Sequence, residues 1–235
     1  DFIKGIGIFL VVWGHTMIPR STYIYSFHMP LFFFISGFFL KNYPFLTFLK
    51  KKFNRLLIPF IFFFLISWIY YSIPYIFNND VSGLKEHLYK VIYMFIGLPK
   101  NGGNDTIWFL SCLFAISIIY YLMQKMSNSE IVKHITIIGL TSIGILFSIY
   151  KITLPFKLDT ALSVIIFYHI GYYLKKNAYV ITKLDQLKGL YLIPTIIVLI
   201  TVHLFLTKLN LQYSEINWVR TAGNQFGNYI LFFLG

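Results

Sequence analysis

Two titratable side chains, those of Lys4 and His15, lie at the edge of and within an apolar segment that opens the chain. Residues 6–17 are apolar enough to belong to a membrane-spanning helix, where charged and titratable groups are costly. The separation of 11 residues is close to three helical turns, which places both side chains on one face, roughly 16 Å apart along the axis. A neutral imidazole suits such a low-dielectric position, and its pKa suits removal of a proton near neutral pH. The same spacing also fits a lysine that reaches the headgroups and a histidine hydrogen-bonded to a neighbouring helix.

A second group of side chains that could do chemistry lies in the basic segment 50–55. Lys51 and Arg55 are spaced i and i+4, so a helix places both on one face. The apolar residues 56–59 lead straight into a predicted span, and the two charges are therefore expected at the membrane surface. Two cations fixed there suit phosphate groups. The simpler interpretation is that the segment only sets the orientation of the chain in the membrane.

Three further side chains are weaker candidates, and each has a structural alternative. His28 lies at the outer entrance of the second predicted span, two residues before Pro30, and the short connection from the first span allows it to lie near His15. Its alternative role is hydrogen bonding at the helix end. Trp108 follows a flexible turn and is expected to anchor the chain at the headgroup level. Asp159 opens the sixth predicted span, and its alternative is a structural partner within the helices.

The composition assigns the chain to the membrane proteins. Of 235 residues, 57% are hydrophobic and 12% charged, which is far more apolar than a soluble domain. We therefore predict an all-α fold, a polytopic bundle of transmembrane helices in which residues 1–235 form a single membrane-embedded domain. About 20 mostly apolar residues cross the hydrocarbon layer. By that length the sequence contains seven complete spans and the start of an eighth near Tyr229: 2–18, 25–40, 56–77, 106–123, 131–150, 160–174 and 190–207.

The basic residues set the expected orientation. The connections after the second and sixth spans carry clusters of lysine and arginine and are expected in the cytoplasm. This places Lys4 at the inner surface and His15 in the outer half of the membrane, with residues 78–105 outside. In that outer stretch, apolar residues recur at helical spacing from Val81 to Phe95, which predicts an amphipathic helix lying over the bundle. Because the sequence stops inside its last apolar run, we interpret it as C-terminally truncated.

Three ordered segments resemble motifs of the acyltransferase 3 family of integral membrane acyltransferases. Segment 1–15, with ten residues between Lys4 and His15, looks like the opening motif of that family. Segment 26–37, Ser-Phe-His-Met-Pro-Leu-Phe-Phe-Phe-Ile-Ser-Gly, is similar to its second helix. Segment 51–59, Lys-Lys-Phe-Asn-Arg-Leu-Leu-Ile-Pro, resembles its cytoplasmic basic motif, with Lys51 where the family often has arginine. Segments 108–110 and 159–172 resemble the family more weakly. The family usually has about ten spans, so two or three would follow residue 235.

The resemblance implies transfer of an acyl group, usually acetyl, from cytoplasmic acyl-coenzyme A to a hydroxyl of an extracytoplasmic sugar or cell-surface polysaccharide. Lys51 and Arg55 would hold the phosphates of the donor at the inner face, with Lys4 at the same end. His15 would act as general base or as a transient acyl carrier. Acyl-CoA is then a substrate, and no permanently bound cofactor is expected. The acceptor-side candidates are His28, Trp108 and Asp159.

Other chemistries fit the sequence less well. No His-x-x-His or Glu-x-x-His spacing occurs, so no metal site is expected, and the single Cys112 excludes a disulfide framework within the chain. The net charge of +12 is interpreted as membrane topology and not as nucleic-acid binding. The alternative function is a transporter or exporter of a polysaccharide or lipid-linked sugar, with Lys4 and His15 lining a conduit. Paired, interrupted helices in two halves would favour it, and the sequence shows none.

Overall fold

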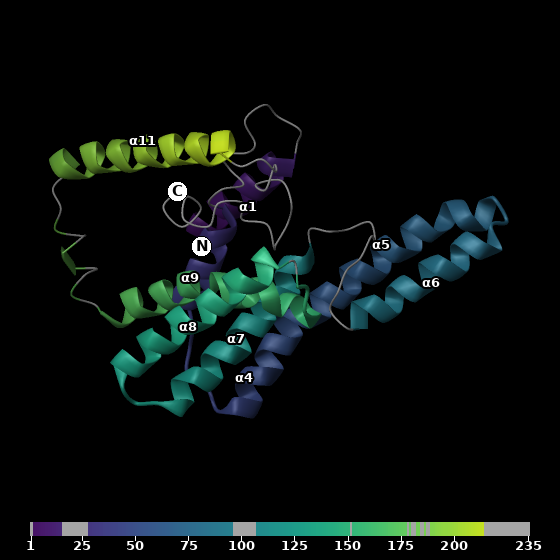
Figure 1. Cartoon of the computed structure of the whole chain (residues 1–235), viewed down its shortest axis with the longest axis horizontal. Helices are drawn as coiled ribbons and strands as arrows, with labels where there is room; N and C mark the ends of the chain where they lie inside the picture. The colour runs from purple at the N-terminus through teal and green to yellow at the C-terminus, as the bar shows by residue number, and fades with distance from the viewer. Residues whose placement is uncertain are drawn as a thin grey trace. The chain divides into compact units, whose positions relative to one another are not determined.

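The computed structural model of the chain is built of helices (Figure 1). It describes residues 2–15, 28–95, 107–150, 152–177, 179, 182–183, 186 and 189–213. No strand occurs among these residues, in agreement with the all-α prediction. The elements are α1 (Phe2–His15), α3 (His28–Phe38), α4 (Phe45–Lys52), the π-helical turn η1 (Phe53–Leu57), α5 (Ile58–Phe77), α6 (Val81–Phe95), α7 (Trp108–Met126), α8 (Glu130–Ile149), the 3-10 turn η3 (Pro155–Lys157), α9 (Leu158–Lys176) and α11 (Gly189–Tyr213).

Each complete span predicted from the sequence overlaps a helix, namely α1, α3, α5, α7, α8, α9 or α11, with different bounds. Within the described ranges, three helices are long and apolar enough to cross a membrane: Phe45–Phe77, Trp108–Met126 and Glu130–Ser148. Shorter apolar helices cover His28–Phe38 and Ile193–Val202. The helices are thus confirmed, whereas the number of seven complete spans stays a prediction. The start of an eighth span, near residue 229, lies outside the described residues.

The helices group into two compact units. The first unit contains α1, α3, the part of α9 that begins at Val164, and α11. The second unit is Lys41–Ser163, with α4 to α8, both short turns and the beginning of α9. Each unit is described by itself below.

In the second unit, α7 runs antiparallel to the continuous helix formed by α4, η1 and α5. Near the end of α7, Tyr121 stacks on Phe48 of α4, with ring centroids 4.5 Å apart. Just before the start of α7, Ile107 is buried together with Phe60 and Phe64 of α5. Aromatic rings of this size dominate the burial of apolar surface in a helix pair. The C-terminal end of α7 therefore lies beside the basic segment of α4.

The continuous helix contains one wide turn, η1, directly after the basic segment. The N–H of Ile58 donates to the carbonyl of Phe53, the i→i−5 bond of a π-helix. Pro59 accounts for the position of this turn, because proline has no N–H and its ring would clash with the carbonyl of Arg55, four residues earlier. The regular i,i+4 geometry predicted for Lys51 and Arg55 is corrected accordingly, since Arg55 lies inside the π turn.

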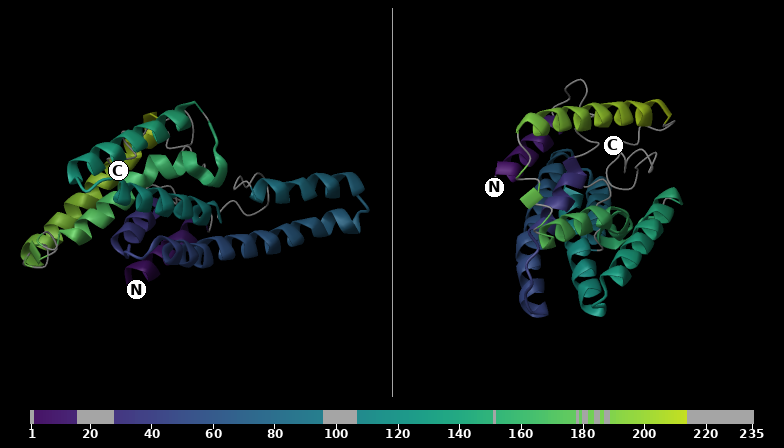
Figure 2. Two further views of the ribbon diagram at one scale, coloured as in Figure 1. Left: turned by 90° about the horizontal axis from the view of Figure 1, so that it is seen from below. Right: turned by 90° about the vertical axis from the view of Figure 1, so that its left-hand side faces the viewer.

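Helix α6 packs along the second half of α5 (Figures 1 and 2). Asp80 begins it: its Oδ1 accepts hydrogen bonds from the N–H of Gly83 at 2.9 Å and the hydroxyl of Ser82 at 2.8 Å. These bonds, that of Gly83 first, lower the pKa of Asp80. Further along, Trp68 of α5 donates from Nε1 to the carbonyl of His87 at 2.9 Å. The predicted helix is confirmed, and among the described residues its main contact is with α5; its position over the bundle stays a prediction.

Three glycines let helices approach backbone to backbone. In the first unit, a Cβ on Gly37 of α3 would clash with the carbonyl of Tyr168 in α9, and a Cβ on Gly171 of α9 would clash with the backbone of α3. In the second unit, a Cβ on Gly144 of α8 would clash with the backbone nitrogen of Ser163 in α9. Such approaches require a residue without Cβ. Both halves of α9 are therefore held tightly within their own units.

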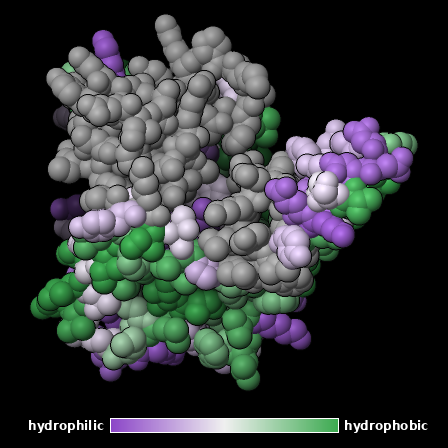
Figure 3. Space-filling model, turned by 45° about the vertical axis from the view of Figure 1, so that its right-hand side comes forward, coloured by the Kyte–Doolittle hydropathy of each residue, from purple (hydrophilic) through white to green (hydrophobic). Residues whose placement is uncertain are grey.

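Large apolar side chains are exposed over much of the described surface (Figure 3). On α5 the exposed side chains include those of Phe62, Phe63, Ile66 and Ile69. Figure 3 shows hydrophobic side chains over the second unit and hydrophilic ones at its lower edge. A soluble protein rarely exposes contiguous apolar patches of this kind. The surface is that of a protein solvated by lipid.

Candidate active site

Helix α1 carries Lys4 and His15 on one uninterrupted stretch of helix, which confirms the predicted helical spacing. The side chains of both residues lie outside the described part of the structure. Helix α1 contacts α3, and a Cβ placed on Gly7 would lie 2.9 Å from Cζ of Phe32. The predicted adjacency of the first two spans is therefore confirmed for the helices.

His28 is the first residue of α3, and its side chain is only 2% exposed. A buried imidazole requires a partner inside the protein, and His28 has one. Pro30 occupies the first turn of the helix, where a missing N–H costs nothing. His28 is thus held in a fixed place within the first unit, and its acceptor-side role stays a prediction.

Lys51 is held against an aromatic ring. Its Nζ lies 3.6 Å from the ring centroid of Tyr43, a residue of the irregular segment that precedes α4. This is a cation–π contact, in which the ring face attracts the ammonium group. Tyr43 is itself fixed, because the hydroxyl of Tyr121 in α7 donates to its carbonyl at 2.9 Å. Arg55 lies exposed in the π turn that follows.

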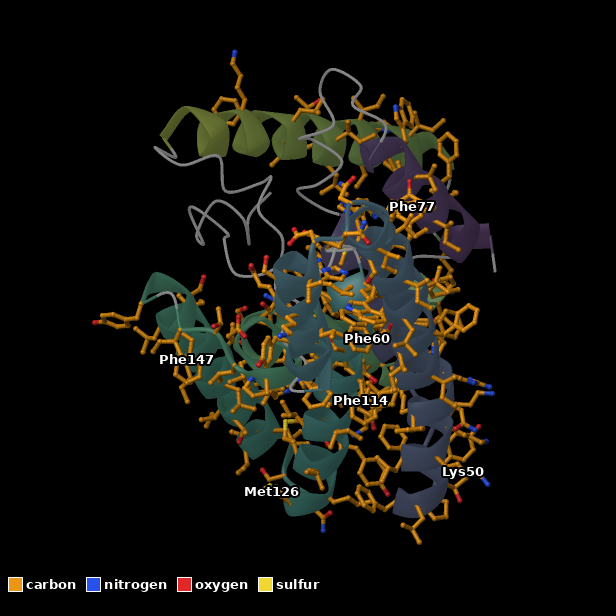
Figure 4. All side chains as sticks on the ribbon, turned by 90° about the vertical axis from the view of Figure 1, so that its right-hand side faces the viewer. Lys50, Phe60, Phe77, Phe114, Met126 and Phe147 are labelled. Carbon is orange, nitrogen blue, oxygen red and sulfur yellow. The ribbon has the colours of Figure 1, made fainter. Side chains whose placement is uncertain are left out.

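Two further lysines lie over neighbouring aromatic rings at the same end of the second unit. Lys52 Nζ lies 5.6 Å from the ring centroid of Phe48, and Lys125 Nζ lies 5.8 Å from the ring centroid of Tyr121. Figure 4 shows Lys50 and Met126 at this end, with Phe77 at the opposite end of the long helix. We call the following residues the basic cluster: Tyr43, Phe48, Lys51, Lys52, Arg55, Tyr121 and Lys125.

The basic cluster lacks acidic side chains. Within the described ranges, none of its four cations has a carboxylate within ion-pair distance; an ion pair does join Lys133 and Glu130 in α8. Cations without a carboxylate partner are available to anions, and ammonium and guanidinium groups both bind phosphate. The arrangement therefore suits a ligand that carries phosphate groups.

The pKa of the Tyr43 hydroxyl is sensitive to the cations near it. Hydrogen bonding to Lys51 lowers the pKa of this hydroxyl below its usual 10.0, and the positive charges of Lys51, Lys41 and Arg55 lower it further. A nearby cation favours the ionised form of a phenol. Lys51 and Arg55 thus act on the same hydroxyl, although η1 interrupts the regular helix between them.

Trp108 does not have the exposed position expected of a headgroup anchor. Its side chain is only 7% exposed, and its carbonyl accepts a hydrogen bond from the hydroxyl of Ser111 at 2.8 Å. The anchor interpretation is wrong because Trp108 begins α7 at a point where the helix is already packed against α5. The sequence signal, an aromatic residue after a glycine-rich turn, does not distinguish an anchor from a buried ring.

Asp159 is a buried carboxylate, 1% exposed, near the start of α9. One oxygen accepts from the N–H of Leu154 at 3.0 Å, and the other accepts from the hydroxyl of Thr160 at 3.2 Å. The preceding turn has two residues with positive φ, Phe156 and Lys157, at 55° and 54°. Such strained backbone needs a fixed anchor. The contacts support the structural alternative for Asp159.

The candidates thus fall into two groups. The first unit holds Lys4, His15 and His28, and the second holds Lys51, Arg55, Trp108 and Asp159. In the second unit, α7, which begins at Trp108, contacts η3, the short turn that precedes Asp159. No group of three metal-binding side chains was found among the described residues.

A family model described as an acyltransferase domain matches residues 1–235, the whole chain. The chain belongs to the acyltransferase 3 family. The resemblance seen in the three sequence motifs is therefore confirmed, and together with the apolar helices it identifies an acyltransferase-family membrane protein. Neither the curated proteins nor the solved structures contain a match to the chain.

Sequence reasoning missed part of the basic cluster of this acyltransferase 3 protein. Tyr43 and Tyr121 are 78 positions apart, and only the packing of α7 beside α4 brings them together. Lys125 follows the fourth predicted span, which ends at residue 123, and carried a weak signal, since a lysine just after the inner end of a span could share the cytoplasmic side with segment 50–55. The sequence alone does not place it on a particular ring.

Replacement of Asp159 by alanine is expected to lower stability by about 2 kcal/mol, because a buried hydroxyl donor and a part-buried N–H donor lose their acceptor. The measurement is the midpoint of thermal unfolding of the acyltransferase 3 chain in detergent. Asp80→Ala is the matched control, since Asp80 also accepts two hydrogen bonds but lies at an exposed helix start, and it should cost about 1 kcal/mol or less. An unchanged midpoint together with lost activity would instead favour an acceptor-side role for Asp159.

Proposed function

We propose that this protein is a multi-pass O-acyltransferase of the cytoplasmic membrane. It moves an acyl group from cytoplasmic acyl-CoA to a hydroxyl of an extracytoplasmic sugar or cell-surface polysaccharide. We propose acetyl as the acyl group, with succinyl as the second candidate. The observation that carries the proposal is the match of the acyltransferase family over residues 1–235. The basic cluster supports it, because the donor carries several phosphate groups and the cations of the cluster have no acidic ion-pair partner in the described part of the chain.

The donor would bind at the basic cluster, with its phosphates on Lys51 and Arg55. Arginine binds phosphate through a planar fork of N–H donors and lysine through a compact ammonium group, so the pair offers two kinds of contact. Lys4 would lie at this donor end as well. The long pantetheine arm would then carry the thioester away from the phosphates and toward His15.

In the proposed reaction, His15 takes the proton from the acceptor hydroxyl as its oxygen attacks the thioester carbonyl. The new C–O bond forms, the C–S bond breaks, and the thiolate of coenzyme A leaves and takes up the proton. If His15 is instead an acyl carrier, the acyl group first moves to the imidazole and then to the acceptor. His28 and Trp108 would lie on the acceptor side in either route.

The test is acyl transfer from radiolabelled acetyl-CoA in membranes that express the protein. Lys51→Ala/Arg55→Ala is expected to raise the KM for the donor by about 10- to 100-fold, because each charged hydrogen bond to phosphate is worth about 1.5–3 kcal/mol and the two losses need not add in full. The KM for the acceptor should not change. Lys85→Ala, which removes an exposed lysine of α6, is the control and should behave as wild type.

Two results would contradict the proposal. If wild-type membranes transfer no label from acetyl or succinyl donor while export of a glycan depends on the protein, the transporter alternative replaces it. If label is transferred but the double variant has the donor KM of the wild type, the donor site lies elsewhere.

A further inference from the structure

Tyr43 lies where three parts of the second unit meet. Its ring faces the ammonium of Lys51 at 3.6 Å, and its carbonyl accepts the hydroxyl of Tyr121 at 2.9 Å. Tyr121 in turn stacks on Phe48, one turn of α4 before Lys51. The ring under Lys51 is therefore attached to both helices that form this end of the unit.

A lysine held in this way remains able to bind a ligand. An ammonium group has three N–H donors, and the ring face occupies one side of it. The donors that do not point toward Tyr43 can contact a phosphate oxygen. Free lysine side chains lose about 2 kcal/mol of rotamer entropy when a ligand fixes them. A lysine already fixed by Tyr43 loses less, so the contact pre-organises it for binding.

We propose that Tyr43 is a positioning residue of the donor site, whose ring fixes the ammonium of Lys51 beside Arg55 so that both cations meet a phosphate group of the acyl donor. This inference rests on the proposed function, because it assigns the phosphate to acyl-CoA. The phosphate of an anionic lipid headgroup has the same chemistry and is the competing source.

The effect of Arg55 on Tyr43 adds support to this geometry. Arg55 lies within the π turn, and its charge helps to lower the pKa of the Tyr43 hydroxyl, as do those of Lys51 and Lys41. The hydroxyl thus marks the point on which the positive charges converge, and a phosphate placed there would meet more than one of them.

The experiment measures binding of free coenzyme A to the purified protein in nanodiscs of phosphatidylcholine. Tyr43→Leu removes the ring and is expected to weaken binding by about 3- to 10-fold, the range of a partly exposed cation–π contact. Tyr43→Trp keeps a ring face and should bind within about twofold of wild type. Tyr150→Leu is the matched control: its side chain is 72% exposed at the end of α8, and binding should not change.

Kinetics and a second background separate positioning from a general structural effect. Tyr43→Leu should raise the donor KM by the same factor, with kcat and the acceptor KM unchanged. In the Lys51→Ala background the same substitution should have no further effect, because the cation it positions is gone. An equal loss in both backgrounds would overturn the inference, as would wild-type affinity in Tyr43→Leu. If Tyr43→Leu is poorly folded, a loss of affinity in the well-folded Tyr43→Trp protein would overturn it as well.

The remaining outcomes separate this inference from the proposed function. If the wild type does not bind coenzyme A, the proposed function itself fails. If phosphatidylglycerol in the nanodisc abolishes coenzyme A binding and Tyr43→Leu lowers retention of that lipid, the phosphate is a headgroup and the donor assignment is overturned. If Lys51→Ala weakens coenzyme A binding and Tyr43→Leu does not, the proposed function stands and only the role of Tyr43 is lost.

Discussion

The His15→Ala protein is expected to transfer acyl groups about 100- to 10,000-fold more slowly than wild type, the usual contribution of a general base. Without the imidazole, the acceptor hydroxyl keeps its proton and attacks the thioester poorly. The measurement is incorporation of radiolabelled acetyl into cell-surface glycan at matched protein abundance. Donor binding should not change, because His15 is expected to lie in the outer half of the membrane and the basic cluster at the inner face.

His134→Ala is the matched control for this substitution, since it removes a histidine from α8 instead of α1. It should label glycan as the wild type does. Label that stays on the protein when acceptor is absent, and that disappears in His15→Ala, would identify His15 as a transient acyl carrier. Equal labelling by His15→Ala and wild type would show that another residue carries the chemistry.

The second large effect is expected from Gly144→Ala, which should destabilise the protein by about 1–3 kcal/mol. The added Cβ would clash with the backbone nitrogen of Ser163, and backbone cannot move aside as a flexible side chain can. The direction of the change in the free energy of unfolding is informative, because Gly→Ala inside a helix normally stabilises a protein by about 1 kcal/mol. The midpoint of thermal unfolding in detergent should fall by about 2–12 °C.

Gly139→Ala provides the internal standard. Gly139 lies in the same helix, and no heavy atom lies within 4 Å of a Cβ placed there. This variant should unfold at the wild-type temperature or slightly above it. If both variants behave alike, the close approach of α8 and α9 in the second unit is wrong.

The helices were predictable from the sequence because their signal is local. A run of apolar residues of sufficient length, as in α5 or α7, specifies its own helix, and the amphipathic spacing after Val81 specified α6. The π turn was not predicted, although the sequence contains Pro59. Pro59 lies near the start of the predicted third span, where a proline fits a regular helix start, and only the structure shows that α4 and α5 are continuous there.

The same limit applies to the candidate site: its local motif was predictable, and its contacts between distant segments were not. The motif around Lys51 and Arg55 identified a basic segment, and the structure places a group of cations there. Tyr43 carried no signal, because its partner Tyr121 comes from a distant helix. Trp108 and Asp159 carried signals that fit both a functional and a structural role, and burial separates these only once neighbouring helices are known.

The wide turn of η1 also affects which face of the long helix points toward α7 on either side of the turn. Each residue of an α-helix rotates by about 100°, so Phe48 and Phe60, which are 12 positions apart, would point about 120° apart on a regular helix. If the π turn absorbs one residue, the difference falls to about 20°. Phe48 and Phe60 can then both face α7, and the additional residue widens the outer wall of the turn that carries Arg55.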